Sequence, residues 1–168
     1  LVFWLIFVAL PALLLPQAAL RHVAAGWARS SLWLMRVVAG TRYEVIGREN
    51  IPAGGLMVAA KHQSFWETFT LFTLFPDPVF ILKRELMRIP LFGWCLAKLR
   101  MIPVDRGARA RALKDVTRRA TVELGQKGRQ LLIFPEGTRR PPGAPPAYKF
   151  GVAHLYAELQ DRKSTRLN

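Results

Sequence analysis

Short apolar runs recur along most of the chain, separated by amphipathic stretches. Four of these runs have the length of buried strands and are bounded by glycine, proline or polar residues: 56–60, 79–82, 101–104 and 131–134. Residues 41–46 alternate between apolar and polar side chains, which also predicts a strand. The segment after it, as far as Gly55, is rich in turn residues.

The segments between the predicted strands have helical spacing. It is clearest over residues 108–127, where apolar side chains share one face and basic side chains occupy much of the rest. Further helices are predicted from Ser64 to Pro76, over residues 83–99 with a break near Pro90 and Gly93, and from Gly151 onward. Strands that alternate with helices predict an α/β domain, a layered sheet flanked by helices.

The first 20 residues carry no charged side chain. A helix of about 20 apolar residues spans a bilayer core, but Pro11 and Pro16 interrupt this one, so a kinked or re-entrant helix fits as well. Basic residues and two tryptophans follow, as at a cytoplasmic membrane flank. We therefore expect membrane attachment, spanning or monotopic. A cleaved signal peptide fits poorly because no basic segment precedes the apolar run.

The composition limits the kinds of molecule that the protein is expected to bind. The chain has 168 residues, enough for one domain, with 25 Lys+Arg against 11 Asp+Glu and a net charge of +14. Such a charge suits an anionic membrane or a nucleic acid. Nucleic-acid binding leaves the uncharged leader unexplained, and no usual recognition signature is present, so we do not expect it. Cys95 is the single cysteine, which excludes an internal disulfide and a cysteine-based zinc site.

A histidine and a carboxylate follow the first apolar run. His62 lies in the predicted loop and Glu67 in the first turn of the next helix, so the carboxylate can fold back toward the imidazole. Such a contact fixes the tautomer and leaves the other ring nitrogen free as a general base. However, Ser64-x-x-Glu67 is also a capping box, and the spacing does not choose between the two interpretations.

Two more polar segments follow the third and fourth runs, a position where α/β proteins build sites. Arg106 offers a planar set of donors suited to a phosphate, although Asp105-Arg106 also fits a plain salt bridge. In the other segment, Gly137 permits close backbone approach to a ligand, and Arg139 and Arg140 suit an anion. The alternative there is a solvated turn with two exposed arginines.

Taken together, the segments resemble the 1-acylglycerol-3-phosphate acyltransferase (PlsC-like) family of the glycerolipid acyltransferase superfamily. The resemblance runs from about Tyr43 to Leu159. It rests on four blocks in the family's order and spacing: Lys61–Glu67, Lys83–Trp94, Pro103–Arg106 and Phe134–Arg139. One departure is Glu67, where the commonest form of the family has aspartate. The block is thus the HX4E variant of HX4D, which is familiar among bacterial members.

The resemblance implies a fold like that of glycerol-3-phosphate acyltransferases and an activity. A fatty acyl group would move from acyl-CoA or acyl carrier protein to lysophosphatidic acid, giving phosphatidic acid for phospholipid biosynthesis. His62 would be the catalytic base and Glu67 the acid that orients it. The positions associated with the acceptor's phosphate and glycerol are Arg106, Glu136, Gly137, Thr138 and Arg139. No cofactor or metal is expected, because a thioester needs none. The alternative acceptor is another lysophospholipid.

The expected organisation has three parts. Residues 1–40 form a hydrophobic anchor with an interfacial helix, residues 41–160 form the acyltransferase domain, and residues 161–168 look like translated adapter sequence. Family members continue into a further strand and helix, so we expect a domain truncated at its C-terminus, with weak or no activity in this chain. The resemblance to bacterial members, with the basic flank after residue 20, places the expected domain on the cytoplasmic side of the inner membrane.

Overall fold

Four parallel strands form the sheet in the part of the chain that the structure describes. The computed structural model describes residues 5–105, 107, 109–126 and 128–164. The strands are β1 (Leu56–Ala59), β2 (Pro78–Lys83), β3 (Ile102–Val104) and β4 (Gln130–Ile133). Each of the four strands predicted from the apolar runs is confirmed. Their order across the sheet is β1-β4-β2-β3, so the last of the described strands lies between the first two.

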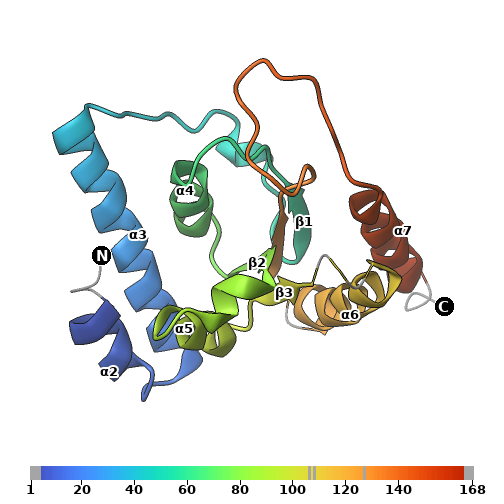
Figure 1. Ribbon diagram of the computed structural model, residues 1–168, viewed down its shortest axis with the longest axis horizontal. Coiled ribbons are helices and arrows are strands. Elements are labelled where there is room, and N and C mark those ends of the chain that lie inside the picture. Colours follow the sequence, from blue (N-terminus) through green and yellow to red (C-terminus); the bar gives the residue numbers. More distant parts are fainter. Residues whose placement is uncertain (1–4, 106, 108, 127, 165–168) are drawn as a thin grey trace.

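Helices cover both faces of the sheet (Figure 1). One face carries α3 (Gln17–Ala39), α4 (Trp66–Leu74) and α5 (Phe92–Lys98), and the other carries α6 (Arg109–Thr121) and α7 (Phe150–Ser164). A π-helical turn, Val122–Gln126, continues α6. Parallel strands buried on both faces need apolar side chains on both, which explains their unbroken apolar runs. The predicted α/β architecture is confirmed.

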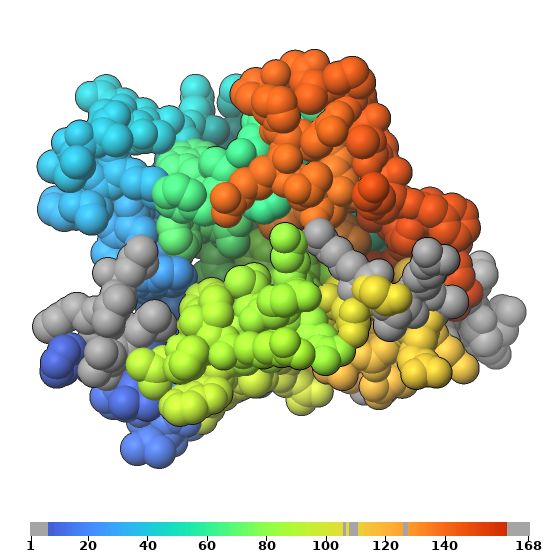
Figure 2. Space-filling model, in the orientation of Figure 1, coloured from blue at the N-terminus to red at the C-terminus, as the bar shows by residue number. Residues whose placement is uncertain are grey.

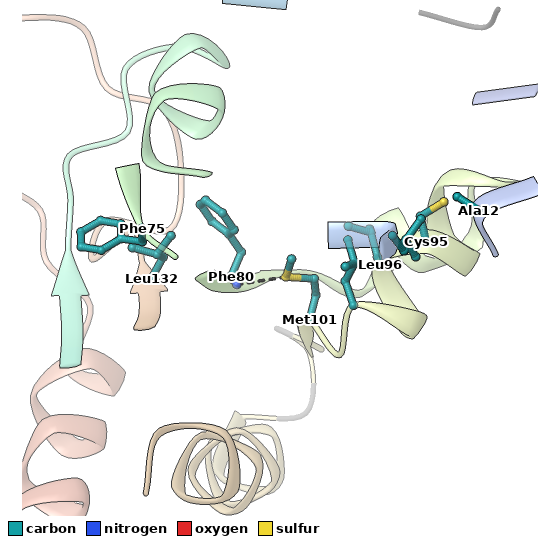
Figure 3. Close-up of a cluster of buried hydrophobic side chains, with 9 residues drawn as sticks. Ala12, Phe75, Phe80, Cys95, Leu96, Met101 and Leu132 are labelled. Atoms are coloured by element: carbon teal, nitrogen blue, oxygen red, sulfur yellow. Dashed lines mark hydrogen bonds between the residues drawn. The ribbon is translucent and has the colours of Figure 1, made fainter. Parts of the chain in front are cut away.

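Alternate strand residues point into two cores. Phe80 of β2 and Leu132 of β4 belong to the core under α3, α4 and α5 (Figure 3). Their chain neighbours Val79 and Leu131 face the opposite way, where Ala120 of α6 completes the second core. Because successive strand side chains point to opposite faces, the two cores share one sheet.

Residues 41–46 do not form the predicted strand. They run exposed from Gly40, which ends α3 in the left-handed conformation (φ 65°), to Gly47. A strand needs a neighbour to bond its backbone N–H and C=O groups, and none of the described strands pairs with this segment. The alternating pattern gives this segment side chains that suit a strand, but no described strand lies beside it to pair with.

The helical segment after β2 is divided in two. A 3-10 helix, Arg84–Arg88, precedes α5, and the predicted break near Pro90 is confirmed. Gly93 was predicted to contribute to that break but lies inside α5. A Cβ added there would sit 2.1 Å from the carbonyl oxygen of Met87, so this glycine permits close backbone packing.

The leader packs against the rest of the molecule along one flank (Figures 1 and 2). A π-helical turn and a short helix precede α3: Leu5–Ala9 and α2 (Leu10–Ala12). Lys98 of α5 donates a hydrogen bond to the carbonyl of Leu13. Among the residues described, no helix combines the length and the apolar character needed to cross a membrane. At the other end, residues 161–164 continue the backbone of α7, and 165–168 lie outside the described residues.

A chain of ion pairs links the leader helix to the amino end of the sheet. Arg21 of α3 pairs with Asp77 (2.8 Å), which also pairs with Arg129 (2.9 Å). Arg129 pairs in turn with Glu123 (2.8 Å), and Glu123 with Arg100 (2.8 Å). Arg129 and Glu123 are almost fully buried, at 3% and 4% exposure. Arg21, Asp77 and Arg100 are partly exposed. We call these five residues the buried ion chain, after the buried pair at its centre.

Candidate active site

The carboxyl ends of the four described strands meet at one edge of the sheet, and polar residues follow each of them. His62 follows β1, Lys83 ends β2, Asp105 follows β3, and Glu136 lies in the loop after β4. Parallel pairing brings these ends together; in register, Lys83 faces Val104. The structure therefore assembles in space the polar segments that the sequence separates.

The His62 imidazole is hydrogen-bonded to the Glu67 carboxylate. Nδ1 of His62 lies 2.5 Å from Oε1 of Glu67, and both side chains are only about one-fifth exposed. His62 belongs to the loop after β1, and Glu67 is the second residue of α4, so the first helical turn carries the carboxylate back to the loop. With Nδ1 engaged, Nε2 is the ring nitrogen available to a substrate.

Glu67 also holds the chain entering α4. Its carboxylate accepts hydrogen bonds from the backbone N–H groups of Gln63 (2.9 Å) and Ser64 (3.0 Å) and from the Ser64 hydroxyl (2.8 Å). Burial raises the pKa of Glu67, but the hydrogen bonds from His62 and Ser64 outweigh it and hold this pKa below its usual 4.5. One ionised carboxylate thus makes both the bond to His62 and the bond to the Ser64 N–H that a capping box predicts. The capping box is incomplete, because Phe65 stands at the N-cap of α4 and the Ser64 hydroxyl oxygen accepts from the Trp66 N–H (3.0 Å).

Two further contacts fix His62. Its ring stacks on Phe134, with the ring centroids 4.1 Å apart and the planes inclined by 16°. Its carbonyl oxygen accepts a hydrogen bond from the backbone N–H of Arg140 (2.8 Å). The loop after β4 is therefore fastened to the loop after β1.

The loop after β4 is itself held by Glu136. This side chain is 2% exposed, and Oε1 accepts a hydrogen bond from the Ala147 N–H (3.2 Å). The Lys149 N–H donates to the carbonyl of Pro135 (2.9 Å), which ties the start of α7 to the same loop. Gly137 turns the chain with a φ of 65°, in the left-handed region that favours glycine.

A cavity of about 1290 Å³ opens beside His62. Aromatic side chains make up much of its wall: Trp27, Phe69, Phe72, Phe80, Phe92 and Phe134. Its charged lining comes from the strand ends and the start of α7: Lys83, Asp105, Glu136, Arg139 and Lys149. The cavity thus combines a largely apolar wall with the histidine and a few charged side chains, both basic and acidic.

The structure groups most of the predicted site residues. His62, Glu136, Gly137, Thr138 and Arg139 line the cavity. Glu67 stands behind His62, while Arg106 lies outside the described residues. The Asp105 carboxylate accepts a hydrogen bond from the Gly107 N–H (3.0 Å). It also forms an ion pair with Arg84 of the 3-10 helix, a residue distant from it in the sequence.

Sequence reasoning gave no role to Lys83, Lys149 or Phe134. Lys83 occupies the last position of a strand, which was a usable signal, because side chains at that position face the site edge. Lys149 and Phe134 reach the cavity through the fold of the loop after β4, which residue spacing did not reveal.

Comparison with known proteins extends this description. The family model described as Acyltransferase matches residues 42–163. The chain belongs to the Acyltransferase family. A 1-acyl-sn-glycerol-3-phosphate acyltransferase of Pseudomonas aeruginosa is 49% identical over 127 residues, covering 76% of this chain and 49% of that protein. A chloroplastic enzyme of the same name from Brassica napus is 32% identical, covering 68% of this chain and 33% of that protein.

The fold of this family member has a solved counterpart. The crystal structure of the 1-acyl-sn-glycerophosphate (LPA) acyltransferase PlsC from Thermotoga maritima superposes with a TM-score of 0.71 at 21% identity, covering 94% of this chain and 65% of that one. The α/β architecture with its parallel sheet and flanking helices is therefore shared. The chain spans about half the length of the Pseudomonas relative and a third of the plant relative.

Proposed function

We propose that the protein transfers a fatty acyl group from a thioester donor to the free hydroxyl of lysophosphatidic acid, as a step of phospholipid biosynthesis. The observation that carries the proposal is the His62–Glu67 pair at a cavity with a largely apolar wall whose lining also includes Lys83, Arg139 and Lys149. The names of the Pseudomonas and plant relatives support the same reaction. The donor is acyl-CoA or acyl carrier protein, and neither a cofactor nor a metal takes part.

The proposed step begins at the acceptor hydroxyl. His62 Nε2 takes its proton while the oxygen attacks the thioester carbonyl carbon, and the Glu67 carboxylate stabilises the imidazolium that forms. The tetrahedral intermediate then collapses with cleavage of the C–S bond. The thiolate leaves and receives the proton from His62, which returns the base to its starting state.

The cavity has basic side chains suited to the phosphate of the acceptor. Arg139, Lys83 and Lys149 line it from three different segments and supply positive charge for a dianion. Arg106 is proposed to join them. Glu136 is itself an anion; its buried bond to the Ala147 N–H supports the loop that presents Gly137, Thr138 and Arg139.

A second acceptor class has one observation in its favour. A lyso-ornithine lipid O-acyltransferase of Pseudomonas aeruginosa is 33% identical over 106 residues, covering 63% of this chain. That lipid class is therefore the alternative acceptor to include in the assay.

Membrane association of residues 1–40 is also proposed, by monotopic contact at the cytoplasmic face of a bacterial inner membrane. Several large apolar side chains of the leader and α3 are exposed: Leu14, Trp33, Leu34, Val37 and Val38. Arg29 and Arg36 lie among those of α3, as in helices that rest on anionic lipid. Such contact would also give an apolar acyl chain a route into the cavity.

The deciding experiment compares His62→Ala with His154→Ala, a histidine of α7 outside the cavity lining. Release of the thiol from acyl-CoA is measured with lysophosphatidic acid and with lyso-ornithine lipid. Loss of the base is expected to lower kcat by about 10²–10⁴-fold, while the control retains the wild-type rate.

Because the chain spans about half the length of the Pseudomonas relative, the same variants are also made in a chimera. It carries the segment that follows the aligned region of the Pseudomonas relative. Equal turnover by His62→Ala and wild type would refute the role of the base. A wild-type chimera without transfer to either lipid would refute the proposed reaction.

A further inference from the structure

The catalytic histidine is the end of a row of aromatic rings. Beyond the His62–Phe134 stack, Phe134 contacts Phe80 with a centroid distance of 6.2 Å, and Phe80 contacts Phe72 at 6.3 Å with nearly parallel planes, inclined by 5°. Phe134 follows β4, Phe80 belongs to β2 and Phe72 to α4. All four rings also line the cavity. We call this row the aromatic ladder.

The far part of the ladder is fixed by the core. Phe80 is 6% exposed, and its backbone N–H donates to Sδ of Met101 (3.2 Å), a buried residue just before β3. Phe134 therefore packs against a ring that has little freedom to move. A side chain so supported can in turn define the position of the imidazole on its other side.

The imidazole needs that second constraint. The covalent bond at Cγ and the hydrogen bond between Nδ1 and Glu67 hold two atoms of the ring, but coupled changes of χ1 and χ2 can still rotate the ring plane and carry Nε2 out of line. Contact of the ring face with Phe134 at 4.1 Å and 16° removes this rotation. The same phenyl face lies within the range in which an aromatic ring attracts a cation, such as the imidazolium formed during proton transfer.

We propose that Phe134 is a positioning residue for the base: it fixes the plane of the His62 ring and stabilises the imidazolium of the transition state. The inference rests on the proposed acyl transfer. It assigns Phe134 an effect on the chemical step, even though this residue also contributes to the apolar wall of the cavity.

The test uses two variants made in the same chimera: Phe134→Leu, which keeps an apolar side chain and removes the ring face, and Phe134→Tyr, which keeps that face. Phe134→Leu is expected to lower kcat about three- to tenfold and to change KM by less than about twofold. Phe134→Tyr is expected to keep the wild-type kcat. A role confined to acyl-chain binding would instead raise KM and leave kcat in place.

A spectroscopic measurement accompanies the kinetics. Protons of an imidazole stacked on a phenyl face are shifted upfield in the NMR spectrum. That shift is expected for His62 in the wild type and in Phe134→Tyr, and to be lost in Phe134→Leu. Phe75→Leu, at a buried phenylalanine of the same core that does not line the cavity, is the control for general destabilisation and is expected to keep both the shift and kcat.

Either of two results would overturn the inference: an unchanged His62 shift in Phe134→Leu, or an unchanged kcat in that variant. A wild-type chimera that transfers no acyl group would refute the proposed function. The histidine shift would still decide, in that case, whether Phe134 holds the ring.

Discussion

Replacing Arg129 by methionine tests the buried ion chain. Methionine keeps most of the apolar volume of the side chain and removes its charge. Arg129 is 3% exposed and pairs with Glu123 and Asp77, and it also donates to the Leu99 carbonyl oxygen at 3.1 Å. Its loss would leave the buried Glu123 with Arg100 as its described partner.

The loss of stability expected for Arg129→Met follows from the burial of its ion pairs. Breaking a buried pair by removing one partner costs about 3–5 kcal/mol, because the remaining charge keeps its desolvation penalty. In this variant Asp77 keeps its ion pair with Arg21, and Glu123 keeps its ion pair with Arg100. We therefore expect the lower end of that range, a loss of about 3 kcal/mol of unfolding free energy. With a urea dependence of about 2 kcal/mol per M, the midpoint of unfolding should fall by about 1.5 M.

Urea unfolding in detergent, followed by far-UV circular dichroism, measures this effect. Arg118→Met is the matched control, since Arg118 pairs with Asp115 at 2.8 Å with its side chain 68% exposed. Exposed pairs contribute about 0–1 kcal/mol, so the control should unfold close to the wild type. Equal unfolding midpoints for Arg129→Met and Arg118→Met would refute the assignment of stability to the buried chain.

Two further predictions concern the site and the leader. The hydrogen bonds of Glu67 lower its folded-state pKa, so its stabilisation is present above the usual 4.5 and is lost as the pH falls through the folded value. The difference in unfolding free energy between wild type and Glu67→Gln should therefore shrink from neutral pH toward acid; a constant difference would contradict this. Flotation with anionic phospholipid vesicles should be reduced when Trp33 and Val38 are both replaced by serine, and wild-type flotation by that double variant would refute the proposed membrane contact.

Much of the fold could be predicted because it depends on local pattern. The four described strands and the long amphipathic helix follow from apolar runs and spacing that any short window contains. The strand predicted at 41–46 failed because a strand also needs a partner, which a short window cannot show. The strand order was not predictable either, since the pairing of Leu56 with Gln130 joins residues far apart in the chain.

The same difference between contacts close in sequence and contacts distant in sequence applies to the site. The His62–Glu67 contact spans five positions and was open to prediction from spacing. The stack of His62 on Phe134 and the burial of Glu136 depend on where the loop after β4 folds. Arg129 stands in a run of polar residues before β4 that resembles a solvated turn, and only the tertiary structure shows it buried among distant partners.

The central place of β4 has a consequence for synthesis on the ribosome. β1 and β2 do not pair with each other, and β4 bonds to both of them. At about 5–20 residues per second, the ribosome needs several seconds to extend the chain from β1 to β4. Until β4 is made, the edges of β1 and β2 that it will pair with present backbone N–H and C=O groups without their native partner. Nascent chains of this protein therefore depend on prompt arrival of β4, or on protection by chaperones, to avoid association through those edges.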